Sequence, residues 1–302
     1  MQKTSTRRGV LCALGAYLIW GLAPAYFKHI QQVPATEILT HRIVWSVFFM
    51  AALLTICGKW RQVGQVCRRG QTLLTLGLTS LLVGGNWLLY IWAVNHHHML
   101  EASLGYFINP LVNILLGMVF FRERFRKAQW LAVALACCGV LLQLWKFGSL
   151  PVIALGLALS FAFYGLLRKK LGIDPQVGML IETLWLLPAG AWYLFVLADS
   201  PTSHLADNSL GLNLWLVSAG VITTVPLLLF AGAANHLRLS TLGFFQYLGP
   251  TLMFLLAVFC YGETLTEDKL YTFGFIWLAL AVFIGDAVVR QRQSRHSRVG
   301  VA

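Results

Sequence analysis

Long, continuously apolar segments alternate along this chain with short polar or basic segments. Ten such runs stand out, centred on residues 9–28, 36–57, 72–95, 100–121, 127–145, 150–168, 177–197, 212–235, 240–261 and 269–289. Each has about 20 mainly apolar residues, the length of a helix that crosses a bilayer. Membrane β-strands would instead alternate polar and apolar positions over about 10 residues. The pattern therefore predicts an all-α integral membrane protein with ten transmembrane helices.

The composition excludes a soluble domain. Hydrophobic residues make up 58% of the chain and charged residues only 11%, whereas soluble domains carry about 25% charged residues. The net charge of +12 would suggest nucleic acid as the partner of a soluble protein. Here the basic residues lie mainly between the spans, so we expect a lipid bilayer and no nucleic acid. The six cysteines form no CxxC pair and are expected to be small buried hydrophobic residues rather than disulfides or metal ligands.

The basic residues also predict the orientation, because cytoplasmic loops near span ends are enriched in Lys and Arg. With the N-terminus inside, 19 of the 23 Lys and Arg residues fall on the cytoplasmic side. Only Lys28, Arg42, Lys146 and Lys269 fall on the outer side. We therefore expect both termini in the cytoplasm and an even number of spans.

The chain matches itself when it is shifted by 140 residues. Between 93 and 123 seven of 31 positions are identical to their counterparts, without a gap. The informative matches are Asn95 with Asn235, His96 with His236, Pro110 with Pro250 and Glu123 with Glu263. This predicts two five-helix repeats, 1–146 and 147–290, followed by a basic cytoplasmic tail over 291–302.

Five spans per repeat force the second repeat to enter the membrane from the opposite side. Matched positions then lie on opposite faces and carry opposite charges, as Arg42 and Glu182 do. Inverted repeats are a transporter architecture, with the substrate bound near the midplane between them. We therefore expect a secondary transporter that moves a small metabolite or drug-like solute by alternating access, one half rocking against the other. A Walker-type phosphate loop is absent from the sequence, which argues against direct use of ATP.

The chain also resembles a known family over nearly its whole length. The resemblance rests on Ile19-Trp20-Gly21, on the paired segments 105–110 (GYFINP) and 243–250 (GFFQYLGP), and on Glu123 and Glu263 after them. Through these residues it is similar to EamA-type permeases of the drug/metabolite transporter superfamily. The resemblance implies a ten-helix permease of the bacterial inner membrane for small organic solutes, which include amphenicol antibiotics among the candidates. It implies no cofactor and no catalytic residue.

Four ionisable residues within the spans are candidates for handling charge or protons: Glu37, His41, Arg42 and Glu182. A charge inside a span costs about 2.5–3.5 kcal/mol on insertion scales, so such groups serve either function or structural pairing. Glu37, His41 and Arg42 are close in sequence and could form a locally neutralised cluster at the outer mouth. Glu182 could serve a proton or a cationic substrate near the inner mouth, or hydrogen-bond to a neighbouring helix. Both interpretations stay open for each residue.

Polar residues and prolines on the fourth and ninth spans predict a solute cavity. Residues 106, 109, 110 and 113 share one helical face, and a proline within a helix leaves a carbonyl for other groups to satisfy. The predicted cavity residues are Trp20, Asn86, Tyr90, Tyr106, Asn109, Asn113, Tyr164, Gln246 and Tyr247, with helix bending at Pro110, Pro226 and Pro250. The alternatives are interhelical hydrogen bonds for the polar residues and core packing for the aromatic ones.

Other functions have less support in the sequence. The triplet His96-His97-His98 lacks metal-ligand spacing, so no metal site is expected. No clustered carboxylates or Cys/His pair suggest a membrane-embedded enzyme. Glu123 and Glu263 lie at span ends, where helix-end hydrogen bonding is expected. A passive facilitator and a membrane scaffold stay open as alternatives, with a proton as candidate coupling ion and a monomer as the expected state.

Overall fold

The computed structural model describes residues 2–260 and 267–299, with the backbone alone for 2–5, 94–95, 99–100, 267–269 and 290–299. Helices make up every regular element in this part of the chain. Their bounds are α1 (Gln2–Phe27), η1 (Lys28–Ile30), α2 (Ala35–Ile56), α3 (Trp60–Cys67), α4 (Gly70–Asn95), α5 (Met99–Phe121), α6 (Lys127–Phe147), α7 (Val152–Leu171), α8 (Pro175–Trp192), η2 (Tyr193–Leu197), α9 (Leu210–His236), α10 (Leu239–Gln246), α11 (Leu248–Leu255), η3 (Leu256–Cys260) and α12 (Glu267–Val299).

The ten predicted membrane spans are confirmed. Ten helical segments are long and apolar enough to cross a bilayer, and each overlaps one predicted run. Local sequence explains where some of them start and stop. Asp174 caps the start of α8 by accepting hydrogen bonds from the Gln176 and Val177 amides, as helix N-caps commonly do. Gly172 ends α7 in a left-handed conformation, with φ at 59°, which glycine adopts without steric cost.

Three details differ from the simple ten-run pattern. The short helix α3, between the second and third spans, was not predicted. The ninth span is interrupted at Tyr247, where α10 ends and α11 begins, and Pro250 lies in the first turn of α11. Residues 291–299 of the predicted tail continue α12 as helix, and residues 300–302 lie outside the described part.

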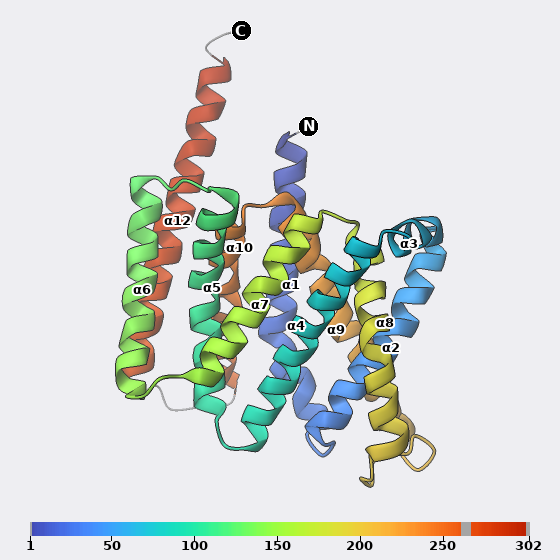
Figure 1. Ribbon diagram of the computed structural model, residues 1–302. Helices are drawn as coiled ribbons and strands as arrows, with labels where there is room; N and C mark the ends of the chain where they lie inside the picture. The colour runs from blue at the N-terminus through green and yellow to red at the C-terminus, as the bar shows by residue number, and fades with distance from the viewer. Residues whose placement is uncertain (1, 261–266, 300–302) are drawn as a thin grey trace.

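Figure 1 shows the helices running up and down in one bundle, with α6 and α12 at one edge and α2 and α8 at the other. The start of α1 and the end of α12 project from the same end, here called the termini end. The opposite end is called the far end. Ten crossings account for this arrangement, because an even number returns the chain to the side where it began.

Packing mixes the two predicted repeats. In one group, α1 packs against α9 and α11, and α2 packs against α8 and α9. In the other, α5 packs against α7 and α10, α4 against α7, and α6 against α12. Smaller contacts such as α4 with α8 and α7 with α9 join these two groups, here called the α1/α9 group and the α5/α7 group. Each group takes helices from both sides of residue 146, so the sequence halves are not separate bodies.

The expectation that cysteines are buried was wrong for four of the six. Cys57, Cys67, Cys138 and Cys260 are exposed, and Cys12 and Cys137 are half-buried. A protein in lipid can present apolar side chains outward, so an apolar run does not imply burial against protein.

Candidate functional site

Arg42 lies inside the bundle near the far end, on the eighth residue of α2. Its Nε donates a hydrogen bond to Thr223 Oγ1 on α9 at 2.7 Å. The guanidinium carbon lies 4.7 Å from the ring centre of Trp87 and 5.7 Å from that of Phe27, within the range of cation–π attraction. No described carboxylate forms a salt bridge with it. Arg42 is therefore a half-buried cation surrounded by aromatic rings rather than by acids.

Three tyrosines complete the surroundings of this arginine. Tyr26, Tyr90 and Tyr106 all lie close enough to interact electrostatically with its guanidinium, and the Tyr90 and Tyr106 rings meet edge to face at 6.1 Å. Tyr106 keeps 43% of its surface exposed although it shares a helical face with the buried residues Asn109 and Asn113. From this shared face and from its nearness to Arg42, we infer that the exposed surface faces the interior of the bundle rather than lipid. We call Arg42, Thr223, Phe27, Trp87, Tyr90 and Tyr106 the Arg42 site.

The Arg42 site lies between the two packing groups. Phe27, Arg42 and Thr223 come from α1, α2 and α9, in the α1/α9 group. Trp87, Tyr90 and Tyr106 come from α4 and α5, in the α5/α7 group. A relative movement of the groups would change the distance between these two walls.

Glu37 and His41 do not pair with Arg42, so the predicted three-residue cluster at the outer mouth was wrong. Glu37 is buried and accepts a hydrogen bond from Thr202 Oγ1 at 3.0 Å. His41 is fully buried, and its Nδ1 accepts a hydrogen bond from Trp45 Nε1 at 3.3 Å. Glu37 and His41 lie one helical turn apart on α2, and Arg42 projects about 100° around the helix from His41. The two residues still neighbour each other.

A cluster of amide side chains lies deeper in the bundle. Asn113 donates to Asn109 Oδ1 at 2.8 Å and to Gln246 Oε1 at 2.7 Å, while Gln246 donates to Asn109 Oδ1 at 2.7 Å. Asn109 also donates to the Ala158 carbonyl at 3.1 Å. All three are at most 7% exposed. The three predicted cavity residues are thus brought together, but as an interhelical network that joins α5, α7 and α10.

Some polar atoms in and beside this amide network have no hydrogen-bond partner. Asn113 Oδ1 is buried without a hydrogen-bond partner, and so is the hydroxyl of Tyr17, which neighbours Gln246. Unsatisfied buried polar atoms are uncommon. They indicate a place where a water molecule or a passing solute would find partners.

An aromatic layer lies beside the amide network. Trp20 is half-buried, with its ring 5.8 Å from Phe161 and 6.0 Å from Phe230. Tyr164 stacks on Phe230 at 5.9 Å and is completely buried. The structure therefore places Trp20 at the edge of this layer and Tyr164 in the core, so the expectation that Tyr164 lines a cavity was wrong for this conformation.

Glu182 lies near the termini end in a fully buried ionic cluster. Its Oε1 accepts a hydrogen bond from Thr79 at 2.6 Å and lies 3.6 Å from Arg168 Nε. Its Oε2 accepts from the Tyr164 hydroxyl at 3.5 Å. The cluster joins α8 of the α1/α9 group to α4 and α7 of the α5/α7 group.

The remaining predicted cavity residues have structural partners. Asn86 donates to the Leu157 carbonyl and to Ser160 Oγ, both at 2.8 Å, and so links α4 to α7. Tyr247 is fully buried and its hydroxyl donates to the Phe107 carbonyl at 3.3 Å, which contradicts a cavity position. Helices α5 and α9 run without interruption through Pro110 and Pro226.

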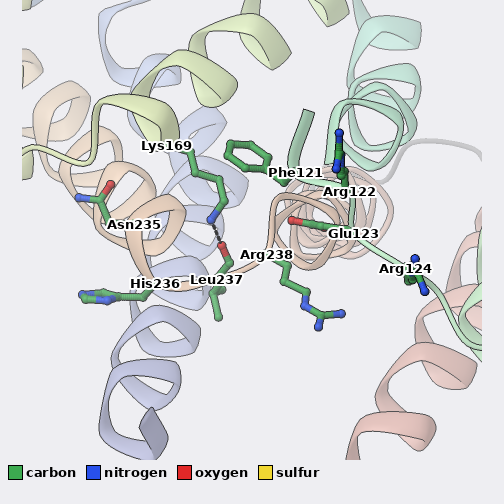
Figure 2. A pocket seen from close by; sticks show the side chains of 9 residues that line it. All are labelled: Phe121, Arg122, Glu123, Arg124, Lys169, Asn235, His236, Leu237 and Arg238. Carbon is green, nitrogen blue, oxygen red and sulfur yellow. Dashed lines mark hydrogen bonds between the residues drawn. The ribbon is translucent and has the colours of Figure 1, made fainter. Parts of the chain in front are cut away.

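A pocket of about 540 Å³ opens at the termini end, and Figure 2 shows the side chains that line it. Glu123 accepts hydrogen bonds from the Leu239 and Ser240 amides at 2.8 and 3.0 Å, and Lys169 donates to carbonyls at the end of α9. The predicted helix-end role of Glu123 is thereby confirmed, whereas Glu263 lies outside the described residues. Arg122, Arg124 and Arg238 point away from one another (Figure 2), so they form no converging ligand set.

Several residues of these sites were missed by sequence reasoning. Trp87 and Phe27 form walls of the Arg42 site, but aromatic residues in apolar spans do not stand out. Only their positions could have indicated a site. Trp87 shares a helical face with Tyr90, three residues later, and Phe27 directly precedes a polar span end. Arg168 is one of the 19 basic residues that the charge pattern places on the cytoplasmic side, because it forms one basic run with Lys169 and Lys170.

Comparison with known proteins is consistent with this architecture. Residues 7–145 match the EamA-like transporter family. The chain is 67% identical over 293 residues to Protein RarD of Salmonella typhimurium, covering 97% of this chain and 100% of that one. It is 56% identical to an uncharacterized transporter of Vibrio cholerae, covering 97% of each. A solved crystal structure with 18% sequence identity shares the fold, with a TM-score of 0.69 over 91% of this chain and 96% of that one.

Proposed function

Because this chain belongs to the EamA-like transporter family, we propose that it is a secondary transporter that moves a small organic solute by alternating access. It is a multi-pass protein of the bacterial inner membrane, with ten spans. Relatives named as transporters point to transport rather than catalysis. The proposal includes the two inverted repeats 1–146 and 147–290. The family match over residues 7–145 supports the first of them.

The position of the Arg42 site between the two packing groups supports this proposal most directly. A solute bound there would touch Arg42 and Phe27 on one side and Trp87, Tyr90 and Tyr106 on the other. Binding energy gained from both walls favours the conformation in which the groups approach each other. The mobile units are then these mixed groups, and not the sequence halves whose rocking the sequence suggested, because the halves interlock.

The two ends of the bundle differ in a way that alternating access requires. At the far end Tyr106 is 43% exposed on the face of α5 that it shares with the buried Asn109 and Asn113. At the termini end the buried Glu182 cluster and the Lys169 contacts with α9 hold the groups together. If Lys and Arg mark the cytoplasmic side, the termini lie in the cytoplasm and this conformation faces outward.

A passive facilitator is the second candidate, and one observation favours it. Glu182, the acid best placed for a proton cycle, is already paired with Arg168, and Glu37 is bonded to Thr202. A proton-coupled cycle would need to break one of these contacts. Proton coupling and facilitation are separated by the same experiment.

Solute counterflow in proteoliposomes tests the proposal. Liposomes containing the purified protein are preloaded with amino acids, organic acids, vitamins, nucleosides or chloramphenicol, and uptake of the labelled solute is followed with and without a pH gradient. We expect saturable exchange that Arg42→Gln abolishes and Arg238→Gln, in the helix-end pocket, leaves intact. A response to the pH gradient indicates proton coupling, and indifference indicates a facilitator. Exchange no faster than in protein-free liposomes for every solute would refute transport.

A further inference from the structure

Arg42 is an arginine that the protein leaves without a counter-charge at a depth where charge is costly. It lies seven residues into α2, about 10 Å from the helix start at 1.5 Å per residue. Arginine does not lose its proton in proteins. Two other arginines are paired with acids. The buried Arg168 faces Glu182, and the partly exposed Arg126 contacts Asp286 at 2.5 Å. Among the described residues, no carboxylate does the same for Arg42.

The protein uses only part of the hydrogen-bonding capacity of this guanidinium. Its Nε is fixed by Thr223, which orients the planar group, while no described protein group accepts from its two terminal nitrogens. Terminal guanidinium nitrogens match the two oxygens of a carboxylate in a bidentate pair. The hydroxyls of Tyr90 and Tyr106 neighbour each other and bond to no other described protein group. They place two hydroxyl groups beside the guanidinium.

The walls of the site determine what kind of body a ligand can carry next to the group that binds Arg42. Trp87 lies over the guanidinium, and Phe27, Tyr90 and Tyr106 present further ring surface. Ligand sites of this composition hold a flat or apolar body and orient it through few polar groups. The side chains contain one cation and no free acid, so they neutralise a single negative charge and offer no carboxylate partner for an ammonium group.

We propose that the Arg42 site binds a small organic monoanion, in which a carboxylate engages Arg42 and an aromatic or apolar body lies against Trp87 and Tyr106. This inference rests on the proposed function, since it names the solute class for the same site. Doubly charged phosphates would bring a second charge that nothing in the site compensates. Zwitterions would bring an ammonium group with the same difficulty.

Saturation-transfer NMR on the purified protein in detergent measures binding without requiring transport. Four solutes with one aromatic body separate the charge classes: 3-phenylpropionate (monoanion), 3-phenylpropionamide (neutral), phenylalanine (zwitterion) and phenyl phosphate at pH 8 (dianion). We expect 3-phenylpropionate to bind at least about tenfold more tightly than each of the others, the size expected of a charge-assisted bidentate contact. Arg42→Gln should bring the acid and the amide within about twofold of each other. Arg238→Gln is the matched control and should leave the preference unchanged.

Several results would overturn the inference. They are equal binding of acid and amide, tighter binding of the zwitterion or dianion, survival of the preference in Arg42→Gln, its loss in Arg238→Gln, or no binding of the acid up to its solubility limit. The ranking of solutes by the wild-type protein stands even if Arg42→Gln does not fold. Binding with this ranking but without counterflow would refute transport and keep the site, whereas counterflow without the ranking would refute only the monoanion.

Discussion

Arg42 and Arg168 show how differently one bundle can accommodate the same side chain. Arg168 is buried and faces Glu182 within 3.6 Å, so each charge depends on the other. Arg42 has aromatic faces and Thr223 but no described acid, and it is only half-buried. The first arrangement suits structural closure, and the second suits a ligand. Their mutational effects should therefore differ.

Glu182→Gln is expected to lower the free energy of unfolding by about 3–5 kcal/mol, because removing one partner leaves Arg168 buried and uncompensated. Arg42→Gln should change it by less than about 1 kcal/mol, since no ion pair is lost. Reversible unfolding in mixed micelles, followed by circular dichroism, measures both. The double variant Arg168→Gln/Glu182→Gln should recover most of the loss. A larger destabilisation by Arg42→Gln than by Glu182→Gln would contradict these assignments.

The amide network should behave as one energetic unit. Asn113 and Gln246 are hydrogen-bonded to each other and to Asn109, so Asn113→Leu and Gln246→Leu remove overlapping contacts. A double-mutant cycle on unfolding free energy should give a coupling of about 0.6–2 kcal/mol, the range found for hydrogen bonds between membrane helices. Strictly additive effects would show that the network contributes nothing beyond its separate residues. Asn208, which bonds to the Thr202 carbonyl in the loop before α9, supplies a control pair with Gln246 that should be additive.

For single residues, the sequence predicted which polar side chains lie inside the bundle better than it predicted their contact partners. Arg42, Tyr106, Asn109, Asn113 and Gln246 stood out as polar groups within apolar runs. Their partners come from helices far away in the chain, as Thr223 does for Arg42, and periodicity along one helix cannot locate them. Arg42 was therefore grouped with Glu37 and His41 because they were near in sequence.

Helix α5 is held at both ends by carboxylates that cap other helices. Glu101, in its first turn, accepts a hydrogen bond from the Ile153 amide at the start of α7 at 2.7 Å. Glu123, just beyond its end, accepts from the Leu239 and Ser240 amides at the start of α10. Both acids lie where a helix N-terminus favours negative charge. Through them α5 fixes the positions of α7 and α10 within the α5/α7 group.

Glu123→Gln should therefore loosen the start of α10. Loss of the charged acceptor is expected to cost about 0.5–2 kcal/mol of local stability, as for other helix caps. Hydrogen exchange followed by mass spectrometry should show faster exchange over residues 239–242 and no change at the start of α7. Glu101→Gln is the matched control and should produce the reverse pattern. Unchanged exchange at α10 in Glu123→Gln would show that the carboxylate is not an effective cap.

The elements themselves were largely predictable, because the length and hydropathy of each run reflect the thickness of the bilayer. The exceptions have local causes. Helix α3 is short and amphipathic, so a search for apolar runs of about 20 residues misses it. The break at Tyr247 interrupts an apolar run whose composition does not change, three residues before Pro250. Helix bending at Pro110, Pro226 and Pro250 stays a prediction.

On the scale of the whole molecule, the two packing groups cross the boundary between the predicted repeats. Sequence symmetry suggested two halves rocking against each other, whereas α1, α2, α8 and α9 pack together across residue 146. Interlocking of this kind cannot be deduced from the repeat, because the repeat fixes the direction of each span but not its neighbours. The Arg42 site at the far end and the Glu182 cluster at the termini end both lie between the groups. Opening one should accompany closing the other.

Paired spin labels measured by double electron–electron resonance test this claim most directly. In a cysteine-free background, labels at the exposed residues Gln32 and Ser103 report the far end, and labels at Ile56 and Arg124 report the termini end. Each pair joins the α1/α9 group to the α5/α7 group. With a solute that counterflow has identified, we predict that the first distance shortens and the second lengthens in the same population. Distances that stay fixed, or that both change in the same direction, would contradict alternating access between these groups.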